Sequence, residues 1–406
     1  MTDPYYNSIV PAHVAPQLVH DFNIYDPEYE DLDLFQSFRR LHEIGLPEIF
    51  WTRNNGGHWI ARRGAVIAEV ARDADRFSSK RMFVPDEQNF ATDFFVPLQA
   101  DPPAHAGYRS IAAPLFASGR IAKLEEGVRT LAGKLISELR MRGECEFTKD
   151  FALQMPVIVF LQLLDLPISD RPRLLKIADR VVRQPPEGEK RDDAMQEMFN
   201  YLRPILEARL AHPGSDVISQ LVTGTINGWP LSADERMGLS ATILTGGLDS
   251  VAATLGLFTR YLAESPAARR RLIGEPKIIP AAIDELLRRF PPTTHGRSVS
   301  RDITFRSVDM REREHVVWAA AMYNFDDELF PEPMKVDFNR KRTANLSFGT
   351  GIHVCAGASL ARLELRIFLE EWLKHIPDFE IKPGVTVRYR PGINIGLQSL
   401  PLQWAV

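Results

Sequence analysis

The fold is decided by residues 348–357, which read Phe-Gly-Thr-Gly-Ile-His-Val-Cys-Ala-Gly. The glycines near Cys355 let the backbone pass close to a flat or bulky group. The segment directly precedes a predicted helix at 358–375, and a helix N-terminus favours an anion and lowers the pKa of a cysteine there. We therefore interpret Cys355 as a nucleophile or a metal ligand. The second cysteine, Cys145, has none of these features and is predicted to be an inert core residue.

Length and composition bound the class of protein. The chain has 406 residues, which at roughly 150 residues per domain suggests two or three domains, or one unusually large one. It is 45% hydrophobic and 25% charged, which argues against disordered and fibrous classes. The formal net charge of −4 argues against a nucleic-acid partner. Two cysteines cannot form a disulfide framework, which fits a reducing cytoplasm.

Neither a targeting segment nor a membrane span is predicted. Acidic residues precede the first basic residue, Arg39, unlike the start of a secretory signal or a transit peptide. The longest uncharged apolar stretch, residues 151–164, is interrupted by glutamine and proline. Because a membrane span needs about 20 apolar residues, this stretch is predicted to be a buried helix. We expect a cytoplasmic protein with no membrane partner.

Most of the middle of the chain is predicted to be helical. Apolar residues recur at helical spacing over residues 121–142, 171–183 and 192–212. The longest helix is predicted over 232–265, where Ser232 and Glu235 form a capping-box pattern. It is apolar on most faces, so we expect it to cross the centre of the molecule.

Shorter elements are predicted on either side of this helical region. A hairpin is expected at 50–61, around the turn Asn-Asn-Gly-Gly at 54–57. A helix is expected to begin at Pro280 and to stop before Pro291, with short strands at 385–390 and 392–397. The polar segment 184–190 is interpreted either as a helix connection or as a mobile lid over a pocket.

The pattern Phe-x-x-Gly-x-His-x-Cys-x-Gly at 348–357 resembles the haem-binding loop of the cytochromes P-450. The C-terminal segments 376–379 and 397–402 resemble those of soluble bacterial, camphor-hydroxylase-like members. The resemblance implies one domain over residues 1–406, mainly α with minor β, with a long central helix crossing the haem and small β-sheets at one side. Three further segments agree with this family in order and spacing: Asp-Pro-Pro-Ala-His at 101–105 followed by Arg109, Gly-Gly-Leu-Asp-Ser at 246–250, and Glu-Leu-Leu-Arg at 285–288.

The resemblance implies a haem b cofactor whose iron takes the Cys355 thiolate as its axial ligand. A thiolate donates electron density that favours cleavage of the O–O bond. Phe348 would shield this ligand, while Gly349 and Gly357 would let the loop approach the cofactor closely. The propionates need cationic or hydrogen-bonding partners. The matching residues are His105, Arg109, Arg297 and His353, and His295 is a further candidate.

Asp249 and Ser250 match the acid and the alcohol that deliver protons during dioxygen activation in this family. Serine stands where the family usually has threonine, and it lacks the methyl group that stiffens χ1. Glu285 and Arg288 are three residues apart and share a helix face. They form either an exposed ion pair or, as the resemblance implies, a buried structural network with Arg340.

The substrate is predicted to contact a largely apolar set of residues with a few hydroxyl groups and one amide. Such a pocket holds an apolar molecule and orients it through one or two polar contacts. We therefore expect a terpenoid or norisoprenoid ketone, or a similar compact apolar molecule. The predicted pocket residues are Phe83, Thr92, Phe94, Phe95, Leu244, Thr245, Thr293, Ile393 and Asn394.

Electrons are expected to come from separate proteins, because no Gly-x-Gly-x-x-Gly stretch follows a predicted strand. The resemblance implies a [2Fe-2S] ferredoxin with its NAD(P)H-dependent reductase, dioxygen as co-substrate, and a monomeric enzyme. A basic face on the cysteine side of the haem would attract an acidic ferredoxin, although these charges could equally be only solvated. Its predicted residues are Arg109, Arg340, Lys341, Arg342 and Arg362.

The sequence leaves other functions open. A peroxide-driven or non-oxygenating haem-thiolate enzyme often lacks the acid–alcohol pair, so Asp249 and Ser250 argue against it. A haem sensor or carrier would have no use for that pair. In a non-haem interpretation Cys355 is a nucleophile and His353 its base, but these residues are only two apart and no third orienting group is evident.

Overall fold

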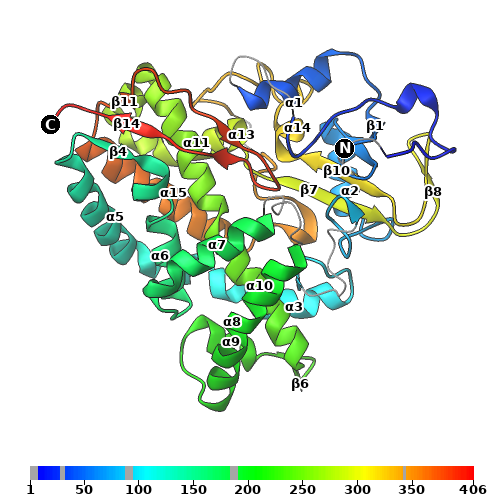
Figure 1. Cartoon of the computed structure of the whole chain (residues 1–406), viewed down its shortest axis with the longest axis horizontal. Coiled ribbons are helices and arrows are strands. Elements are labelled where there is room, and N and C mark those ends of the chain that lie inside the picture. Colours follow the sequence, from blue (N-terminus) through cyan, green and yellow to red (C-terminus); the bar gives the residue numbers. More distant parts are fainter. Residues whose placement is uncertain (1–7, 28–32, 87–94, 183–190, 342–343) are drawn as a thin grey trace.

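Helices make up about half of the described chain, and most of them gather at one side of the molecule, while the main sheet lies at the other side with a few helices beside it (Figure 1). The computed structural model describes residues 8–27, 33–86, 95–182, 191–341 and 344–406. Its α-helices are α1 (Leu34–Glu43), α2 (Gly64–Arg72), α3 (Ala104–Ala112), α4 (Ser118–Ile121), α5 (Glu125–Arg140), α6 (Met155–Leu163), α7 (Arg171–Val182), α8 (Arg191–Ala211), α9 (Val217–Val222), α10 (Ala233–Leu248), α11 (Ser250–Glu264), α12 (Pro266–Gly274), α13 (Ile279–Arg289), α14 (Ala320–Asn324) and α15 (Ala358–His375).

The main sheet has the strand order β1-β2-β10-β7-β3. Its β2 and β10 are parallel, whereas the other neighbouring pairs are antiparallel. The strands are β1 (Ile49–Thr52), β2 (His58–Ala61), β3 (Phe77–Ser78), β4 (Glu144–Glu146), β5 (Thr225–Ile226), β6 (Trp229–Pro230), β7 (Thr294–Val299), β8 (Ile303–Phe305), β9 (Val308–Met310), β10 (His315–Ala319), β11 (Glu380–Ile381), β12 (Tyr389–Arg390), β13 (Gly396–Leu397) and β14 (Pro401–Gln403). The fold is therefore mainly α with minor β, as predicted.

The long central helix is present but interrupted. The predicted capping box is confirmed, since the Ser232 hydroxyl accepts from the Glu235 N–H at 3.2 Å and Glu235 accepts from the Ser232 N–H at 2.7 Å. The helix breaks at Asp249, whose φ of −127° and ψ of −44° separate α10 from α11. By length and composition residues 233–264 could cross a membrane, but 61% of their most apolar window is buried inside the protein.

Most other predicted elements are found close to their predicted bounds. The hairpin at 50–61 is formed by β1 and β2, and residues 151–164 contain the buried helix α6. The helix predicted over 121–142 is divided into the end of α4, a short 3-10 turn at Ala122–Leu124, and α5. The segment 184–190 lies outside the described residues.

The last two predicted strands are much shorter than expected. Only Tyr389↔Leu397 and Arg390↔Gly396 pair between β12 and β13. Intervening backbone groups bond to other parts of the chain instead: Gly392 N–H donates to Tyr25 O and Ile393 N–H to Val182 O. A backbone donor used in this way cannot also extend the ladder between the two strands.

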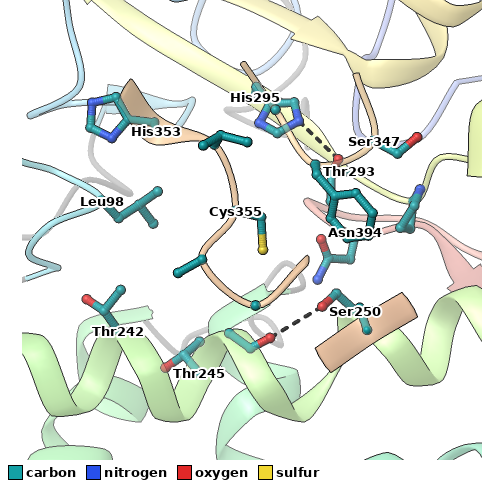
Figure 2. Close-up of a pocket in the computed structure, with 18 of the residues that line it drawn as sticks. Leu98, Thr242, Thr245, Ser250, Thr293, His295, Ser347, His353, Cys355 and Asn394 are labelled. Carbon is teal, nitrogen blue, oxygen red and sulfur yellow. Dashed lines mark hydrogen bonds between the residues drawn. The ribbon is translucent and has the colours of Figure 1, made fainter. Parts of the chain in front are cut away.

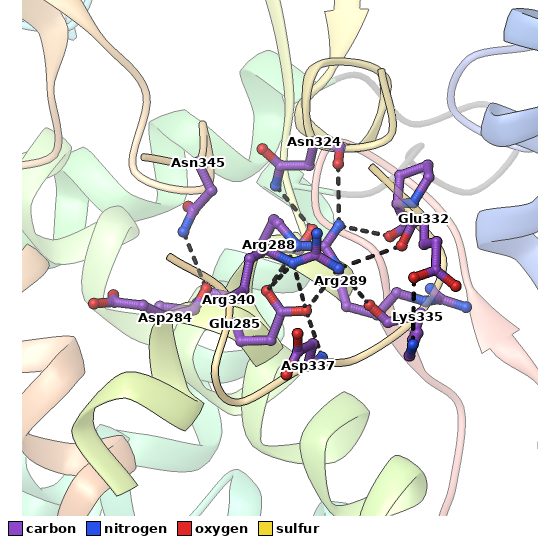
Figure 3. A network of polar contacts seen from close by, with 12 residues as sticks. Asp284, Glu285, Arg288, Arg289, Asn324, Glu332, Lys335, Asp337, Arg340 and Asn345 are labelled. Carbon is purple, nitrogen blue, oxygen red and sulfur yellow. Dashed lines mark hydrogen bonds and ion pairs between the residues drawn. The ribbon is translucent and has the colours of Figure 1, made fainter. Parts of the chain in front are cut away.

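A buried carboxylate holds the segment that leads to the cysteine loop (Figure 3). Glu285 accepts two hydrogen bonds from Arg288, at 2.8 and 2.9 Å, and Arg340 Nε lies 3.1 Å from both carboxylate oxygens. The side chains of Glu285 and Arg288 are at most 1% exposed. The predicted pair is thus a buried network, and the exposed alternative is wrong.

The same network reaches the cysteine loop through Asn324. The Asn324 amide donates to Arg288 O at 3.0 Å and to the Ser347 hydroxyl at 3.2 Å, and it accepts from Leu346 N–H at 2.8 Å. The Ser347 hydroxyl donates in turn to Leu287 O at 2.7 Å. Residues directly before the Cys355 loop are therefore fixed to α13 by buried hydrogen bonds.

We expect Glu285→Gln to lower the free energy of unfolding by about 3–5 kcal/mol, because two buried guanidinium groups lose their counter-charge. Urea denaturation of the purified protein measures this change. The matched control is Glu332→Gln, which removes a carboxylate from an exposed pair with Lys335 and should cost less than about 1 kcal/mol. Equal effects of the two substitutions would contradict the structural role of Glu285.

Candidate active site

One large cavity lies between the central helix and the loop before α15, with a volume of about 410 Å³. Its walls come from α3, α10, α11, β7, the cysteine loop and the turn between β12 and β13. Figure 2 shows the Cys355 sulfur pointing out of its loop into this space, across from Ser250 on the central helix. Segments separated by some 290 residues therefore form one site.

The cysteine loop has a tightly defined backbone. Gly349 and Gly351 have φ values of +71° and +69°, a region in which a side chain would be strained. Cys355 N–H donates to Phe348 O at 2.8 Å, which closes the loop. Gly357 contributes differently, since a Cβ there would lie 3.9 Å from the Cys355 sulfur. The glycines thus shape the loop and leave the sulfur uncovered.

The predicted lowering of the Cys355 pKa is wrong for the protein alone. Burial raises the pKa of this thiol above its ordinary value, although the N–H groups of Gly357 and Ala358 and the charges of Arg109 and Arg362 act in the opposite direction. The Cys355 side chain is solvent-exposed on the side that faces the cavity. A bound metal cation would favour the thiolate, because a metal-ligating cysteine must be deprotonated.

One end of the cavity is cationic. Arg297 is 6% exposed, and it forms a local hydrogen bond from Nη1 to Gly296 O at 2.8 Å. No carboxylate among the described residues forms an ion pair with it, and burial lowers its pKa to about 10. A buried guanidinium without a counter-ion is costly, so this end of the cavity suits an anionic group.

Two histidines lie beside this arginine. The rings of His105 and His353 are 4.5 Å apart, and His353 Nε2 lies 3.0 Å from the Ser79 hydroxyl. Burial, followed by the charge of Arg297, lowers the pKa of His353 to about 3, so its ring is neutral. His105 Nε2 is buried and has no hydrogen-bond partner. With Arg109, which also lines the cavity, the predicted set of anion-binding residues is brought together.

His295 is also in the cavity wall, two residues from Arg297 on β7, so the two side chains share one face of the strand. Its Nε2 lies 3.0 Å from the Thr293 hydroxyl, and its ring stacks on Trp318. Burial lowers its pKa to about 4, which makes it a neutral hydrogen-bonding group rather than a charge.

The break in the central helix faces the cysteine. Ser250 lines the cavity, and its hydroxyl donates to Gly246 O over a long 3.3 Å. Nothing lies within 4 Å of a Cβ built on Gly246, whereas a Cβ on Gly247 would collide with the Phe160 ring at 2.4 Å. The two glycines therefore have different roles: Gly246 leaves space, and Gly247 allows close packing on α6.

Most of the predicted pocket residues that the structure describes line the cavity. They are Phe83, Phe95, Thr245, Thr293, Ile393 and Asn394. Leu244 does not line it, because one position along a helix turns the side chain by about 100°, and Leu244 points into the hydrophobic core. Thr242 and Ile243 line the cavity instead. Thr92 and Phe94 lie outside the described residues.

Two acidic residues at the site were not predicted from the sequence. Glu364 on α15 lines the cavity, has one carboxylate oxygen without a partner, and has its pKa raised well above the ordinary value by burial. Asp101 accepts hydrogen bonds from the Ser78 hydroxyl at 2.5 Å and from Ser79 N–H at 2.8 Å, which positions the partner of His353. Glu364 has no sequence signal, whereas Asp101 belongs to a quoted motif whose role was not assigned.

The predicted basic face is only partly present. Lys341 is exposed, and Arg362 is 45% exposed, but Arg362 also pairs with Asp284 at 3.0 Å and covers the Phe348 ring at 4.5 Å. Arg109 lines the cavity instead, and Arg340 is occupied by Glu285 and is 10% exposed. Arg342 lies outside the described residues.

The Cys355 sulfur points into a large cavity. One end of this cavity is cationic, and the helix across from the sulfur is interrupted at Asp249. Together these features define a haem-thiolate protein. The chain belongs to the cytochrome P-450 family, whose model matches residues 136–405. It is 32% identical to the probable cytochrome P-450 127A1 of Sinorhizobium fredii, over 98% of this chain and 97% of that protein. A steroid C26-monooxygenase of Mycobacterium tuberculosis is 29% identical, over 86% of this chain and 95% of its own length. The crystal structure of CYP101J2 superposes with a TM-score of 0.90 at 35% identity, covering 98% of this chain and 100% of that one.

The family makes this chain a P-450 monooxygenase that carries haem held by a cysteine thiolate. The residues present fit that group. Arg297 offers a buried guanidinium group and His105 a buried ring nitrogen without a partner, which suit the propionates, and the space at Gly246 leaves room on the side of the central helix. Of the two cysteines, only Cys355 lines the cavity, while Cys145 is buried in β4.

We expect Arg297→Met to increase the rate of haem loss about tenfold, because the propionates lose a charged hydrogen-bond donor in a buried site. Transfer of haem to an excess of apomyoglobin, followed by absorbance, measures this rate. Arg301→Met is the matched control, since Arg301 is 55% exposed and pairs with Asp75 at the surface. Unchanged haem loss from the Arg297 variant would exclude a propionate contact.

Proposed function

We propose that this enzyme hydroxylates an unactivated C–H bond of a compact, mainly apolar molecule, with Cys355 as the axial ligand of a haem b. The observation that carries this proposal is the position of the Cys355 sulfur across the cavity from the Asp249–Ser250 helix break. When bound there, haem supplies the binding and activation of dioxygen. Folding of residues 1–406 as one domain, as a cytoplasmic monomer, is part of the proposal.

Asp249 and Ser250 are the proposed proton-delivery pair. The hydrogen bond from the Ser250 hydroxyl to Gly246 O is long, so the hydroxyl is held weakly and can turn toward the cavity. Asp249 is the only acidic residue between Glu235 and Glu264 on the central helix, and it lies at the point where the helix is interrupted. A proton donor at this position would face the reacting side of the cofactor.

The proposed substrate is a terpenoid or norisoprenoid ketone, or a molecule of similar size and polarity. Phe83, Phe95 and Ile393 supply apolar walls, while Thr293 and Asn394 supply polar groups. No lysine lines the cavity within the described residues, and its arginines lie at the end assigned to the propionates. This lining supports an uncharged substrate more than a fatty acid.

A [2Fe-2S] ferredoxin with its NAD(P)H-dependent reductase is the proposed electron donor. The exposed Arg362 covers Phe348 of the cysteine loop, Lys341 is exposed as well, and Arg342 follows Lys341 in the sequence. Positive groups on this face would attract an acidic partner and make its docking sensitive to salt.

The proposal is tested first by the absorption spectrum of the reduced protein under carbon monoxide. We expect the red-shifted Soret band that is typical of a thiolate-ligated haem, and we expect Cys355→Ser to abolish it. Cys145→Ser is the control and should keep the band, because Cys145 is buried away from the cavity. Incorporation of one atom of isotopically labelled dioxygen into the product then tests the reaction itself. A thiolate band that survives Cys355→Ser would overturn the ligand assignment.

We expect Ser250→Ala to divert electrons from product to free hydrogen peroxide by about tenfold or more, because the hydroxyl that assists proton delivery is lost. Product and peroxide are measured per NADH consumed in the presence of ferredoxin and reductase. Ser250→Thr keeps the hydroxyl and adds a stiffening methyl group, so it should retain or improve the yield of product. An unchanged yield in the alanine variant would contradict the role of Ser250.

A further inference from the structure

A side chain from the C-terminal turn reaches the proposed proton-delivery acid. Asn394 Nδ2 donates to Asp249 Oδ2 at 2.9 Å, although the two residues are 145 positions apart in the sequence. Figure 2 shows the Asn394 amide beside Ser250, within the cavity wall. From the sequence, Asn394 is predicted only as a substrate contact.

The backbone of this turn is held from both sides. Ile393 N–H donates to Val182 O at 3.1 Å, and Ile395 N–H donates to Pro292 O at 2.6 Å. Thr294 N–H donates to Ile393 O at 2.8 Å, and Thr293 and Asn394 form an antiparallel bridge. Asn394 therefore projects from a fixed point that is tied to both α7 and the start of β7.

Asp249, in contrast, sits where the backbone is least constrained by its own helix. It is the residue between α10 and α11, and its φ of −127° departs from helical geometry. A hydrogen bond from another segment restricts the side-chain orientations of a carboxylate at such a break. An asparagine amide is suited to this task, because it donates a hydrogen bond without adding a charge that titrates.

We propose that Asn394 is a positioning residue, which orients the Asp249 carboxylate for proton delivery and links that carboxylate to the turn facing the substrate. This inference rests on the proposed role of Asp249. Ile393 and Thr293, the neighbours of Asn394 in the turn and the bridge, line the same cavity. A substrate bound against this turn would therefore contact the same segment that positions the Asp249 carboxylate.

The test compares Asn394→Leu, which has similar volume but no donor, with Asp249→Asn and with the double variant. We expect Asn394→Leu to raise the peroxide-to-product ratio by about fivefold, since a hydrogen bond to a charged group is lost. In the Asp249→Asn background the same substitution should add less than about twofold, because the two residues act through one contact. The substrate dissociation constant is read from the haem spin-state shift for each variant, and the ratios are compared at saturating substrate, because Asn394 also lines the cavity.

Two further measurements separate positioning from a general disturbance. In a crystal structure of Asn394→Leu, the Asp249 carboxylate should leave its present orientation. Ile395→Val, in the same turn but in the hydrophobic core and not in the cavity wall, should leave the peroxide-to-product ratio unchanged because Asn394 keeps its contact. If Asn394→Leu loads haem poorly, Asn394→Ala, which adds no bulk, takes its place. The alanine variant should then show the increase in the peroxide-to-product ratio that is expected of the leucine variant.

The inference is overturned if Asp249→Asn raises the ratio while Asn394→Leu and Asn394→Ala do not. It is also overturned if Asn394→Leu raises the ratio equally in the wild-type enzyme and in the Asp249→Asn variant, since the effect would then not depend on Asp249. If Asp249→Asn itself leaves the ratio unchanged, the proposed role of the acid fails, and the positioning role fails with it.

Discussion

The Glu285 carboxylate is buried between the guanidinium groups of Arg288 and Arg340, and the position of the cysteine loop depends on this arrangement. Buried charges are tolerated only when each is paired and its remaining hydrogen-bonding groups are satisfied. Here Arg288 also donates to three backbone carbonyls, among them Asn324 O. Asn324 then holds Leu346 and Ser347, so a constraint on α13 becomes a constraint on the loop that presents Cys355.

The cavity itself carries charges that its own protein groups leave uncompensated. Arg297 lacks a carboxylate partner among the described residues, and burial raises the pKa of the Cys355 thiol. An anionic group beside Arg297 and a cation at the sulfur would relieve both costs at once. Haem provides such a combination, because its propionates are negative and its iron accepts a thiolate. The site is thus electrostatically complementary to its cofactor at both ends.

The central helix forms the cavity wall opposite Cys355, and it is tightly packed at one position and interrupted at another. Packing of Gly247 on Phe160 fixes the central helix, while Gly246 and the break at Asp249 open it toward the cavity. The turn that bears Asn394 is fixed independently by hydrogen bonds to Val182 and Pro292. Asp249 is thereby held between two elements that are each anchored elsewhere. The hydrogen bond from Asn394 thus connects the acid to a turn that does not belong to its own helix.

Local patterns in the sequence were enough to predict the mainly helical fold, the capping box at Ser232, the cysteine loop and the Glu285–Arg288 pair, because capping, glycine turns and helix periodicity depend on near neighbours. Tertiary structure alone decided that Leu244 leaves the cavity, that Glu364 enters it, and that Asn394 meets Asp249. It also reversed the predicted direction of the Cys355 pKa, since burial outweighs the local helix N-terminus. The physical reason is that burial and contacts between distant segments depend on how the elements pack, which no short stretch of sequence specifies.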